Sequence, residues 1–482
     1  METQTRKITI DTAALFTGRT VGLLIGVVRL NYLATYLGVA NFGVMNFAVY
    51  FTSLFQPLFE LGLSQIVTRD LARDPSRTTS VLGNVLVLKV LVVGAAAIVI
   101  ALAMVFSGFD RTTSVAIMLT TGALAINGLS SVFLAALQAH RKMVFVSVVN
   151  IINDLTLSFA IIILLPAAPV VSTPLILSMA VAVLNLGVLA LLSARLFGQP
   201  VLRAELAAWK SFLREGMQIA VASLGVSIYV FIGPSILRYT RGDVEVGLFS
   251  AGYKFISIFT LLPATVNQVV FPIYSAFFGD AHHKLEKALS DTLRVLALLA
   301  IPLAAGTAIL ASKIFLLVYT RQYDPGIVVL QLMVMGNIFG FMDWVLAAFL
   351  LAGRRQLFLM KLSVATGLGV FLGGMVLIPR FGFVTLPMLS IATELTLFLF
   401  QMREVHRMGY HPLHPSALLK PMLGALVMSG VLLIAWSWSI FILVPMGALV
   451  YFVAIIILRG FGEQERKILQ AILNRIPGVY RP

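Results

Sequence analysis

Long uninterrupted stretches of apolar residues constrain this chain more than any other feature. Residues 81–106 and 175–192 are each near or beyond the roughly 20 residues needed to cross a bilayer. Over the whole chain, 59% of the residues are hydrophobic and 11% are charged, a composition that no water-soluble fold could bury. Because backbone polar groups in lipid must be bonded within the segment, we expect helices, and the alternation of a β-barrel is missing. The chain is predicted to be an all-α polytopic membrane protein.

Fourteen apolar segments are predicted to span the membrane, joined by connections too short to form separate domains. They lie at residues 11–37, 43–67, 80–106, 112–138, 144–165, 173–196, 212–237, 246–277, 288–311, 325–352, 357–378, 382–402, 416–435 and 438–458. The first segment is interrupted by Arg19 and Arg29 and lacks a small-residue cleavage site, which favours a retained span over a signal peptide. Cysteine is absent, which excludes disulfides and thiolate metal sites.

The basic residues follow the predicted connections. Of 35 Lys and Arg residues, 24 lie in or beside the termini and the even-numbered connections, and six lie in the odd-numbered ones. This positive-inside bias predicts that both termini are cytoplasmic. Topology and attraction to anionic membrane lipids therefore explain the net charge of +15, and no nucleic-acid partner is expected. Residues 461–482 carry apolar side chains on one helical face beside basic ones, which predicts an interfacial amphipathic helix on the inner surface.

A weak internal repeat divides the chain into halves. At an offset of 204 residues, 43–58 aligns with 247–262, with Gly43 and Gly247 among the identities. At an offset of 213, a second match pairs Ala135, Ala139, Arg141 and Lys142 with Ala348, Ala352, Arg354 and Arg355. Each offset corresponds to six spans, so the halves would share one orientation and enclose a substrate path. Chance similarity between apolar helices is the alternative. The predicted parts are two six-helix lobes at 1–200 and 201–410, two further spans at 411–460 and the tail at 461–482.

Two segments near the N-terminus carry a family resemblance. Residues 37–43 read LGVANFG, and residues 61–73 read LGLSQIVTRDLAR. With the span count and loop lengths, they resemble the polysaccharide (O-antigen type) flippases of the multidrug/oligosaccharidyl-lipid/polysaccharide (MOP) superfamily. The arginine that often precedes the first Leu-Gly is replaced here by Thr35 and Tyr36. The resemblance implies two facing six-helix bundles with two extra C-terminal helices. It also implies export of undecaprenyl-diphosphate-linked sugars across the bacterial cytoplasmic membrane, beside glycosyltransferases and a polysaccharide polymerase.

Nine charged residues lie more than five residues from either end of the predicted spans. Each would cost about 2.5–3.5 kcal/mol at the bilayer centre if it faced lipid, so we expect them to face a bundle interior or an aqueous cavity. Fixed cations there would offset the dehydration of a diphosphate, which arginine grips with parallel hydrogen bonds. The candidate substrate-binding residues are Arg19, Arg29, Glu60, Lys89, Lys254 and Arg294. The candidates for ion coupling or intramembrane pairing are Asp154, Asp343 and Glu394.

These residues also have structural explanations. Lys89 and Arg294 lie near enough to the inner ends of their spans to snorkel to the interface. Lys254 and the three acids are alternatively paired within a lobe. Pro57 and Pro263 lie in matching spans of the two halves, which makes them hinge candidates, with accommodation of packing as the alternative.

The sequence contains no enzyme signature. A phosphate-binding loop with GK[ST] is missing, and the loop histidines lack suitably spaced ligands, so neither ATP-driven transport, a metal nor a cofactor is expected. The predicted function is a secondary transporter that flips a polyprenyl-diphosphate-linked oligosaccharide by alternating access. Two alternatives stay open. An ion-coupled multidrug exporter of the same superfamily is disfavoured by the buried basic residues, and a membrane glycosyltransferase or polysaccharide polymerase would need large acidic outer loops.

Overall fold

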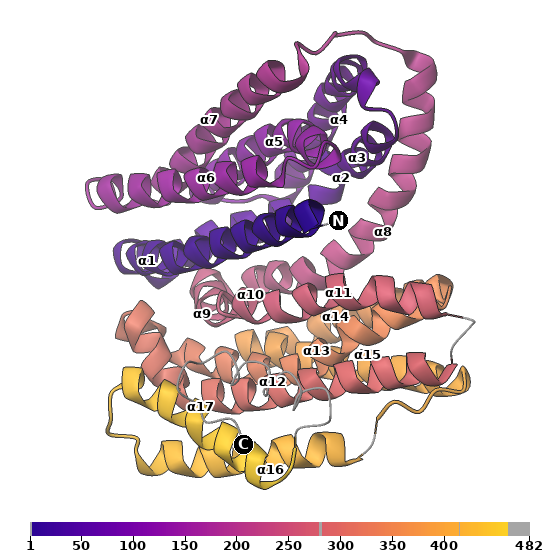
Figure 1. The fold of residues 1–482 in the computed structure, drawn as a ribbon. Coiled ribbons are helices and arrows are strands. Elements are labelled where there is room, and N and C mark those ends of the chain that lie inside the picture. Colours follow the sequence, from indigo (N-terminus) through magenta and orange to yellow (C-terminus); the bar gives the residue numbers. More distant parts are fainter. Residues whose placement is uncertain (1, 279–281, 414, 461–482) are drawn as a thin grey trace. The chain divides into compact units, whose positions relative to one another are not determined.

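The computed structural model describes residues 2–278, 282–413 and 415–460. Every regular element in these ranges is a helix, as predicted (Figure 1). The elements are α1 (Glu2–Leu54), α2 (Gln56–Glu60), α3 (Leu63–Arg73), η1 (Pro75–Arg77), α4 (Thr78–Ser107), α5 (Arg111–Ala139), α6 (Met143–Leu164), α7 (Ser172–Phe197), α8 (Leu206–Arg241), α9 (Asp243–Tyr253), α10 (Ile256–Phe259), α11 (Leu261–Phe277), α12 (His282–Val318), η2 (Arg321–Gly326), α13 (Ile327–Ala352), α14 (Gln356–Phe381), η3 (Gly382–Val384), α15 (Thr385–Arg407), α16 (Pro415–Ile434) and α17 (Ile440–Ile457).

The helices agree with the predicted membrane spans. The described residues contain eleven segments long and apolar enough to cross a bilayer, and a shorter apolar helix at Leu418–Ile434. Two of the eleven segments each contain two helices: α1 is divided at its non-helical Gly38, and Gln356–Arg407 comprises α14 and α15. Counted with the shorter helix, these divisions agree with about fourteen spans. Large apolar side chains are exposed along many of these helices, as lipid contact requires. The chain is a multi-pass membrane protein.

Two predicted spans are broken instead of continuous. In the span predicted at 43–67, α2 ends at Glu60 and α3 begins at Leu63. The two residues between them, Leu61 and Gly62, have left-handed backbone conformations, with φ of 44° and 62°. The span predicted at 246–277 is divided into α9, α10 and α11. The positions of these breaks were not predicted, because hydropathy reports how apolar a segment is and not where its backbone turns.

The chain divides by its contacts into two compact units. Unit 1 comprises Met1–Ser250, Val318–Tyr323 and Gly367–Phe383, and unit 2 comprises Ala251–Leu317, Asp324–Thr366 and Val384–Pro482. In unit 1, α5 packs against α4 and α7, and α1 packs against α6 and α8. In unit 2, α13 packs against α11 and α15, and α16 pairs with α17. The lobe boundaries predicted at residues 200 and 410 stay predictions, and the amphipathic helix predicted at 461–482 lies outside the described residues.

Two helices related by the predicted repeat end in the same turn. Arg141 follows α5 with a φ of 56°, and Arg354 follows α13 with a φ of 58°. In each turn the next residue donates its N–H to the carbonyl five residues before it, at 2.8 Å in the first half and 2.9 Å in the second. The two turns are separated by the offset of 213 residues found in the sequence. The shared turn agrees with the repeat but is not specific to it, because α17 ends in the same way at Arg459, with a φ of 50° and a bond of 2.9 Å from the N–H of Gly460 to the carbonyl of Ile455.

Candidate functional site

The break between α2 and α3 places Glu60 at a helix end inside unit 1. Pro57 lies in the first turn of α2, and its carbonyl accepts the N–H of Leu61. The chain then turns through Gly62 before α3 begins. A helix end within a membrane protein leaves backbone carbonyls that need other donors. Lys89 of α4 supplies one, since its Nζ lies 3.2 Å from the backbone oxygen of Glu60.

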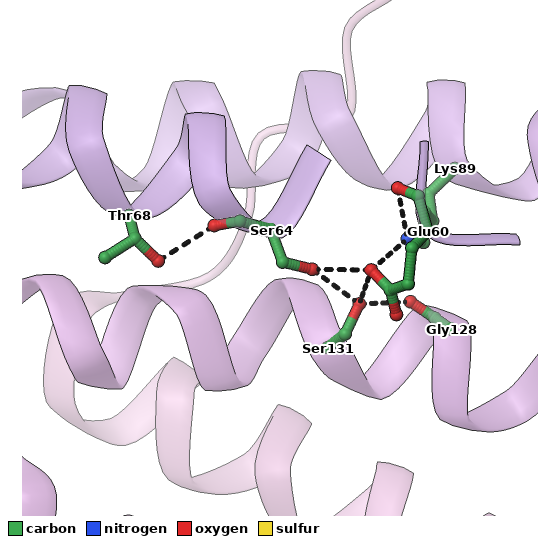
Figure 2. Close-up of polar contacts among 6 residues, drawn as sticks. All are labelled: Glu60, Ser64, Thr68, Lys89, Gly128 and Ser131. Atoms are coloured by element: carbon green, nitrogen blue, oxygen red, sulfur yellow. Dashed lines mark hydrogen bonds and ion pairs between the residues drawn. The ribbon is translucent and has the colours of Figure 1, made fainter. Parts of the chain in front are cut away.

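Figure 2 shows the polar contacts that converge on the Glu60 carboxylate. Its Oε2 lies 3.1 Å from Lys89 Nζ, 2.9 Å from the hydroxyl of Ser64 and 3.3 Å from that of Ser131. The two hydroxyls are 2.9 Å apart, and Ser131 also lies 2.7 Å from the carbonyl oxygen of Gly128. Each serine hydroxyl has one hydrogen and two acceptors within reach, so it can donate to only one of them at a time. We call Glu60, Ser64, Lys89 and Ser131 the Glu60 cluster, which joins α2, α3, α4 and α5.

The two partners of the ion pair differ in burial. The Lys89 side chain is 0% exposed, whereas that of Glu60 is 35% exposed. A buried ammonium without a counter-charge is strongly destabilising, so Lys89 needs Glu60. Lys89 does not snorkel, and in this structure it has no surface from which to touch a ligand. The charged group that the cluster presents is therefore the Glu60 carboxylate.

A cavity of about 570 Å³ lies beside the Glu60 cluster. Its lining residues are Gln56, Pro57, Glu60, Gly62, Ser64, Gln65, Ser131, Leu134, Ala135, Gln138, Ile219, Ser223, Val226 and Ser227. Eight of these fourteen are serine, glutamine or glutamate, although α2, α3, α5 and α8 belong to a largely apolar unit. Hydroxyl and amide groups both donate and accept hydrogen bonds, so this lining suits a neutral ligand rich in hydroxyls.

Most of this lining was missed by sequence reasoning, which considered only charged residues. Gln56 and Glu60 are four residues apart in α2, and so are Ser223 and Ser227 in α8. Polar residues that recur every four positions in an apolar segment mark one face of a helix. That periodicity is the signal that could have identified the cavity.

Arg29 and Asp154 form a second intramembrane pair, between α1 and α6. Arg29 Nη1 lies 3.9 Å from Asp154 Oδ1, and the side chains are 25% and 45% exposed. This distance permits electrostatic attraction but not a hydrogen bond, and Nη1 is buried without a hydrogen-bond partner among the residues that the structure describes. Gly22, two turns earlier on the same helical face, makes room for the acid, because a Cβ there would lie 3.0 Å from Asp154 Oδ2. Arg29 therefore keeps hydrogen-bonding capacity that Asp154 does not fill.

The predicted basic residues do not form one cluster in the described part of the chain. In unit 1, Arg29 and Lys89 pair with different acids. In unit 2, Arg294 Nη2 lies 2.9 Å from Asp291 Oδ1 on the same helix, α12. Lys254 lies at the break between α9 and α10. The side chain of Arg19, on α1, lies outside the described residues.

The predicted acids of unit 2 lie on two packed helices. Asp343 of α13 is buried and accepts a hydrogen bond of 2.5 Å from Gln401 of α15. Glu394, also on α15, packs against α13, since a Cβ on Gly340 would lie 3.1 Å from its Oε2. Asp343 thus has a structural partner, and ion coupling through either acid stays a prediction.

The two hinge candidates occupy similar places. Pro57 is the second residue of α2 and Pro263 the third of α11, and each helix follows a break in a longer apolar segment. Proline is tolerated in a first helical turn because no intrahelical bond is lost there. The hinge role stays a prediction.

A network that the sequence did not reveal lies at the end of α8. The guanidinium of Arg238 is 2.7 Å from Asp243, 3.1 Å from Asp110 and 2.6 Å from the Thr113 hydroxyl, and it lies over the Phe47 ring at 4.7 Å. Burial raises the pKa of Asp110, but hydrogen bonds from Thr113 and the charge of Arg238 outweigh it, so the pKa lies below its usual value. These contacts hold the first turn of α5 against the last turn of α8.

The sequence matches a family model. The model described as polysaccharide biosynthesis protein matches residues 8–278, more than half of the 482 residues. The matched region contains the Glu60 cluster and the Arg29–Asp154 pair. No curated protein matches the chain in sequence.

Three solved structures illustrate the similarity in fold. The lipid II flippase MurJ, in an inward-closed conformation, has a TM-score of 0.78 and 15% identity, covering 94% of this chain and 99% of its own. An inward-facing multidrug resistance MATE family transporter of the MOP superfamily has a TM-score of 0.65 and 14% identity, covering 80% and 95%. A MOP superfamily transporter from Pyrococcus furiosus has a TM-score of 0.55 and 13% identity, covering 83% and 95%. The chain therefore belongs to the polysaccharide biosynthesis protein family, and its fold is that of the flippases and transporters of the MOP superfamily.

Proposed function

We propose that this protein is a flippase that moves a polyprenyl-diphosphate-linked oligosaccharide across the bacterial cytoplasmic membrane by alternating access. The observation that carries the proposal is the cavity beside the Glu60 cluster, where serine and glutamine side chains line a recess in a membrane-embedded unit. A glycan that leaves water loses hydrogen bonds to its hydroxyl groups, and each unreplaced bond costs about 1–3 kcal/mol. A polar lining supplies replacements, which a purely apolar cargo would not need.

The diphosphate of such a substrate needs a cation, and Arg29 is the residue that we assign to it. Its guanidinium is partly exposed, and its ion pair with Asp154 is too long to be a hydrogen bond. Arginine can donate two parallel hydrogen bonds to one phosphate. Lys89, which is sealed from solvent, acts instead by positioning Glu60. Arg294 is already held by Asp291 and is a weaker candidate.

The polyprenyl tail of the substrate requires an apolar surface. Unit 2 offers one in a cavity of about 500 Å³ between α12, α16 and α17. Its walls are almost wholly hydrocarbon, with Leu298, Pro302 and Ile455 among the lining residues. An apolar groove beside a lipid-facing surface would accept a long isoprenoid chain at little desolvation cost. This supports a lipid-linked substrate over a free sugar.

We place both termini in the cytoplasm, because the basic residues concentrate on that side of the predicted topology. Glycosyltransferases would then supply the substrate at the inner leaflet, and a polysaccharide polymerase would consume it at the outer one. We assign no catalytic step and no cofactor to this chain. Alternate opening of the cavity to the two sides would involve the breaks that follow Pro57 and precede Pro263.

A second candidate function is export of cationic amphiphilic molecules by an ion-coupled mechanism. One observation favours it: the charged group that the Glu60 cluster presents is a carboxylate, while the lysine is sealed. A carboxylate beside a cavity attracts a cation rather than a phosphate. The two functions therefore assign different roles to Glu60, as a cation ligand in an exporter and as the support of a glycan-binding wall in a flippase.

Purified protein in vesicles distinguishes these functions. We would load vesicles with an undecaprenyl-diphosphate-linked oligosaccharide and follow the fraction of glycan that an external, membrane-impermeant glycosidase can reach. Wild-type protein should expose the inner pool. Ser64→Ala combined with Ser131→Ala should slow flipping about tenfold or more, at about 1 kcal/mol for each lost hydrogen bond.

Ser178→Ala is the matched control. Ser178 also lies in a span, but within the described residues its hydroxyl bonds only to the Pro174 carbonyl of its own helix, so this variant should flip at the wild-type rate. Vesicles that expel a cationic dye but leave the glycan inside would favour the exporter. Protein that moves neither substrate would refute both assignments.

A further inference from the structure

Three arginines lie near one buried acid where α13, α14 and α15 end or begin on the predicted cytoplasmic side. Glu404 of α15 has a side chain that is 9% exposed. Its Oε1 lies 3.5 Å from Arg355 Nε, and its Oε2 lies 3.6 Å from Arg407 Nη1. Arg403 lies one residue before Glu404, and its side chain is exposed. Three positive charges and one negative charge thus lie at this end of the helices, which leaves two positive charges in excess.

Arg403, Glu404 and Arg407 border a cavity. Its volume is about 240 Å³, and its lining residues are Phe358, Phe400, Arg403, Glu404 and Arg407. Two walls are aromatic rings and the others carry charge. Within the described part of the chain, Arg403 makes no ion pair, so its guanidinium is available to a ligand. A ligand for this cavity must therefore combine negative charge with an apolar portion.

The buried acid makes this more than a group of interfacial arginines. Arg355 follows the left-handed turn at Arg354, and this turn directs it from the end of α13 toward Glu404 on α15. Arg407 reaches the same carboxylate from the next turn of α15. Glu404 lies within 3.6 Å of two guanidinium groups, and its buried charge attracts both of them toward the cavity. The repeat-related turn at Arg141 and Lys142 has no such acid among its described contacts.

The surroundings indicate which kind of anion fits. Large exposed apolar side chains lie beside the cavity on the same two helices, at Leu357, Met360, Leu399 and Phe400. They would contact the acyl chains of the inner leaflet, while the arginines lie at the depth of its phosphate groups. Basic pockets between transmembrane helices on the cytoplasmic side bind anionic lipid headgroups. The volume is less than half that of the cavity beside the Glu60 cluster, which makes it too small for a glycan.

We infer that this cavity binds the phosphate headgroup of an anionic glycerophospholipid of the inner leaflet, with Arg403 and Arg407 as its ligands and Glu404 as the residue that positions Arg407. The inference does not depend on the substrate proposed above. It requires only that α14 and α15 cross the membrane with this end at the headgroup level.

Full-length protein in nanodiscs tests the assignment. Phosphatidylglycerol would be titrated into a phosphatidylcholine bilayer, and bound lipid would be counted by native mass spectrometry. We expect one saturable phosphatidylglycerol for the wild type. Each interfacial cation contributes about 1 kcal/mol, so Arg403→Gln should weaken binding about fivefold and Arg403→Gln with Arg407→Gln about 25-fold. Arg195→Gln, an exposed arginine in the last turn of α7, should bind as the wild type does.

Arg403→Gln is the decisive variant, because Arg403 is exposed and makes no ion pair with any residue that the structure describes, so its loss should not unfold the protein. Wild-type affinity in Arg403→Gln would overturn the inference. An equal loss in Arg195→Gln would overturn it too, since binding would then follow net charge alone. A further experiment adds inorganic phosphate to the protein in a phosphatidylcholine bilayer and measures the melting temperature. If inorganic phosphate raised the melting temperature as much as phosphatidylglycerol does, the cavity would be a site for free phosphate and not for a lipid.

Discussion

The backbones at Gly43 of α1 and Gly247 of α9 approach each other reciprocally. A Cβ on Gly43 would lie 1.8 Å from the carbonyl oxygen of Asp243, and a Cβ on Gly247 would lie 2.2 Å from that of Val39. Gly43 and Gly247 are separated by 204 residues, and so are Val39 and Asp243. Each helix therefore offers the same face to the other, and the contact has a local two-fold relationship. Two positions that align within the sequence repeat also touch in the structure.

A side chain at this crossing should disrupt it. Gly43→Ala places a carbon within 2 Å of a backbone oxygen, which cannot move as a flexible side chain can. We expect a loss of about 1–3 kcal/mol, as in overpacked cores, and strongly reduced transport. The melting temperature in detergent and the flipping rate in vesicles measure the two effects. Gly26→Ala, on the same helix with nothing within 4 Å of its Cβ, should change neither.

Cross-linking would show whether the helices separate. The chain has no cysteine, so Val39→Cys and Asp243→Cys introduce a unique pair. A short bifunctional maleimide should link this pair in the wild-type background and link it poorly when Gly43→Ala is added. Undiminished cross-linking and transport in the Gly43→Ala protein would show that the close approach is not needed.

The sequence predicted the features that composition and periodicity encode. The edges of α5 and α7 lie within a residue or two of the predicted spans, because the change from apolar to polar residues marks where a helix leaves the membrane. The break at Leu61 and Gly62 was not predicted. A left-handed leucine has no compositional signal, and glycine is common in membrane helices for other reasons.

The partners of the intramembrane charges could not be predicted either. Lys89 and Glu60 are 29 residues apart, and their contact depends on how α2 lies against α4. The sequence identified both as residues that cannot face lipid, but it grouped Lys89 with the phosphate ligands. The structure instead seals it behind an acid. Which charges face a cavity is a tertiary property, because each helix can be rotated without changing its hydropathy.

The Glu60–Lys89 pair should behave as a coupled unit. Glu60→Gln leaves the sealed ammonium of Lys89 without a counter-charge. We expect a loss of about 2–3 kcal/mol, less than for a fully buried pair because Glu60 keeps 35% exposure. Adding Lys89→Met removes the orphaned charge and should restore most of that stability. A double-mutant cycle of melting temperatures checks this, and purely additive losses would show that the two residues do not interact.

His140 should make stability depend on pH near neutrality. Its ring stacks on Phe197 at 4.2 Å, and its Nε2 lies 2.8 Å from the Thr78 hydroxyl. Burial, followed by the charge of Lys142, lowers its pKa below the usual value of about 6.5. The unfolded chain therefore takes up a proton at a higher pH than the folded protein does. The stability that neutral His140 contributes is therefore fully present above the pKa of the unfolded chain, and it is lost as pH falls through the pKa of the folded protein.

The measurement is the melting temperature between pH 7.5 and 5. His140→Phe keeps the stacking and removes the titration, so its melting temperature should fall less than that of the wild type on acidification. The same change at exposed His283 controls for the loss of a histidine. If His140→Phe and wild type lose stability in parallel, another group is responsible.

Arg29 tests whether an intramembrane cation serves the substrate or only the fold. If it binds diphosphate, Arg29→Ala should abolish flipping in vesicles and surface polysaccharide in cells, while membrane insertion and melting temperature change little, because partly exposed ion pairs contribute about 1 kcal/mol or less. Arg29→Lys should retain a fraction of the activity, since lysine keeps the charge but cannot donate two parallel hydrogen bonds. Asp154→Asn is the matched control. It removes the partner at 3.9 Å without touching the guanidinium, and it should leave transport near the wild-type rate. Equal losses in Arg29→Ala and Asp154→Asn would mean that the pair itself is what transport needs, and the diphosphate would then require another cation.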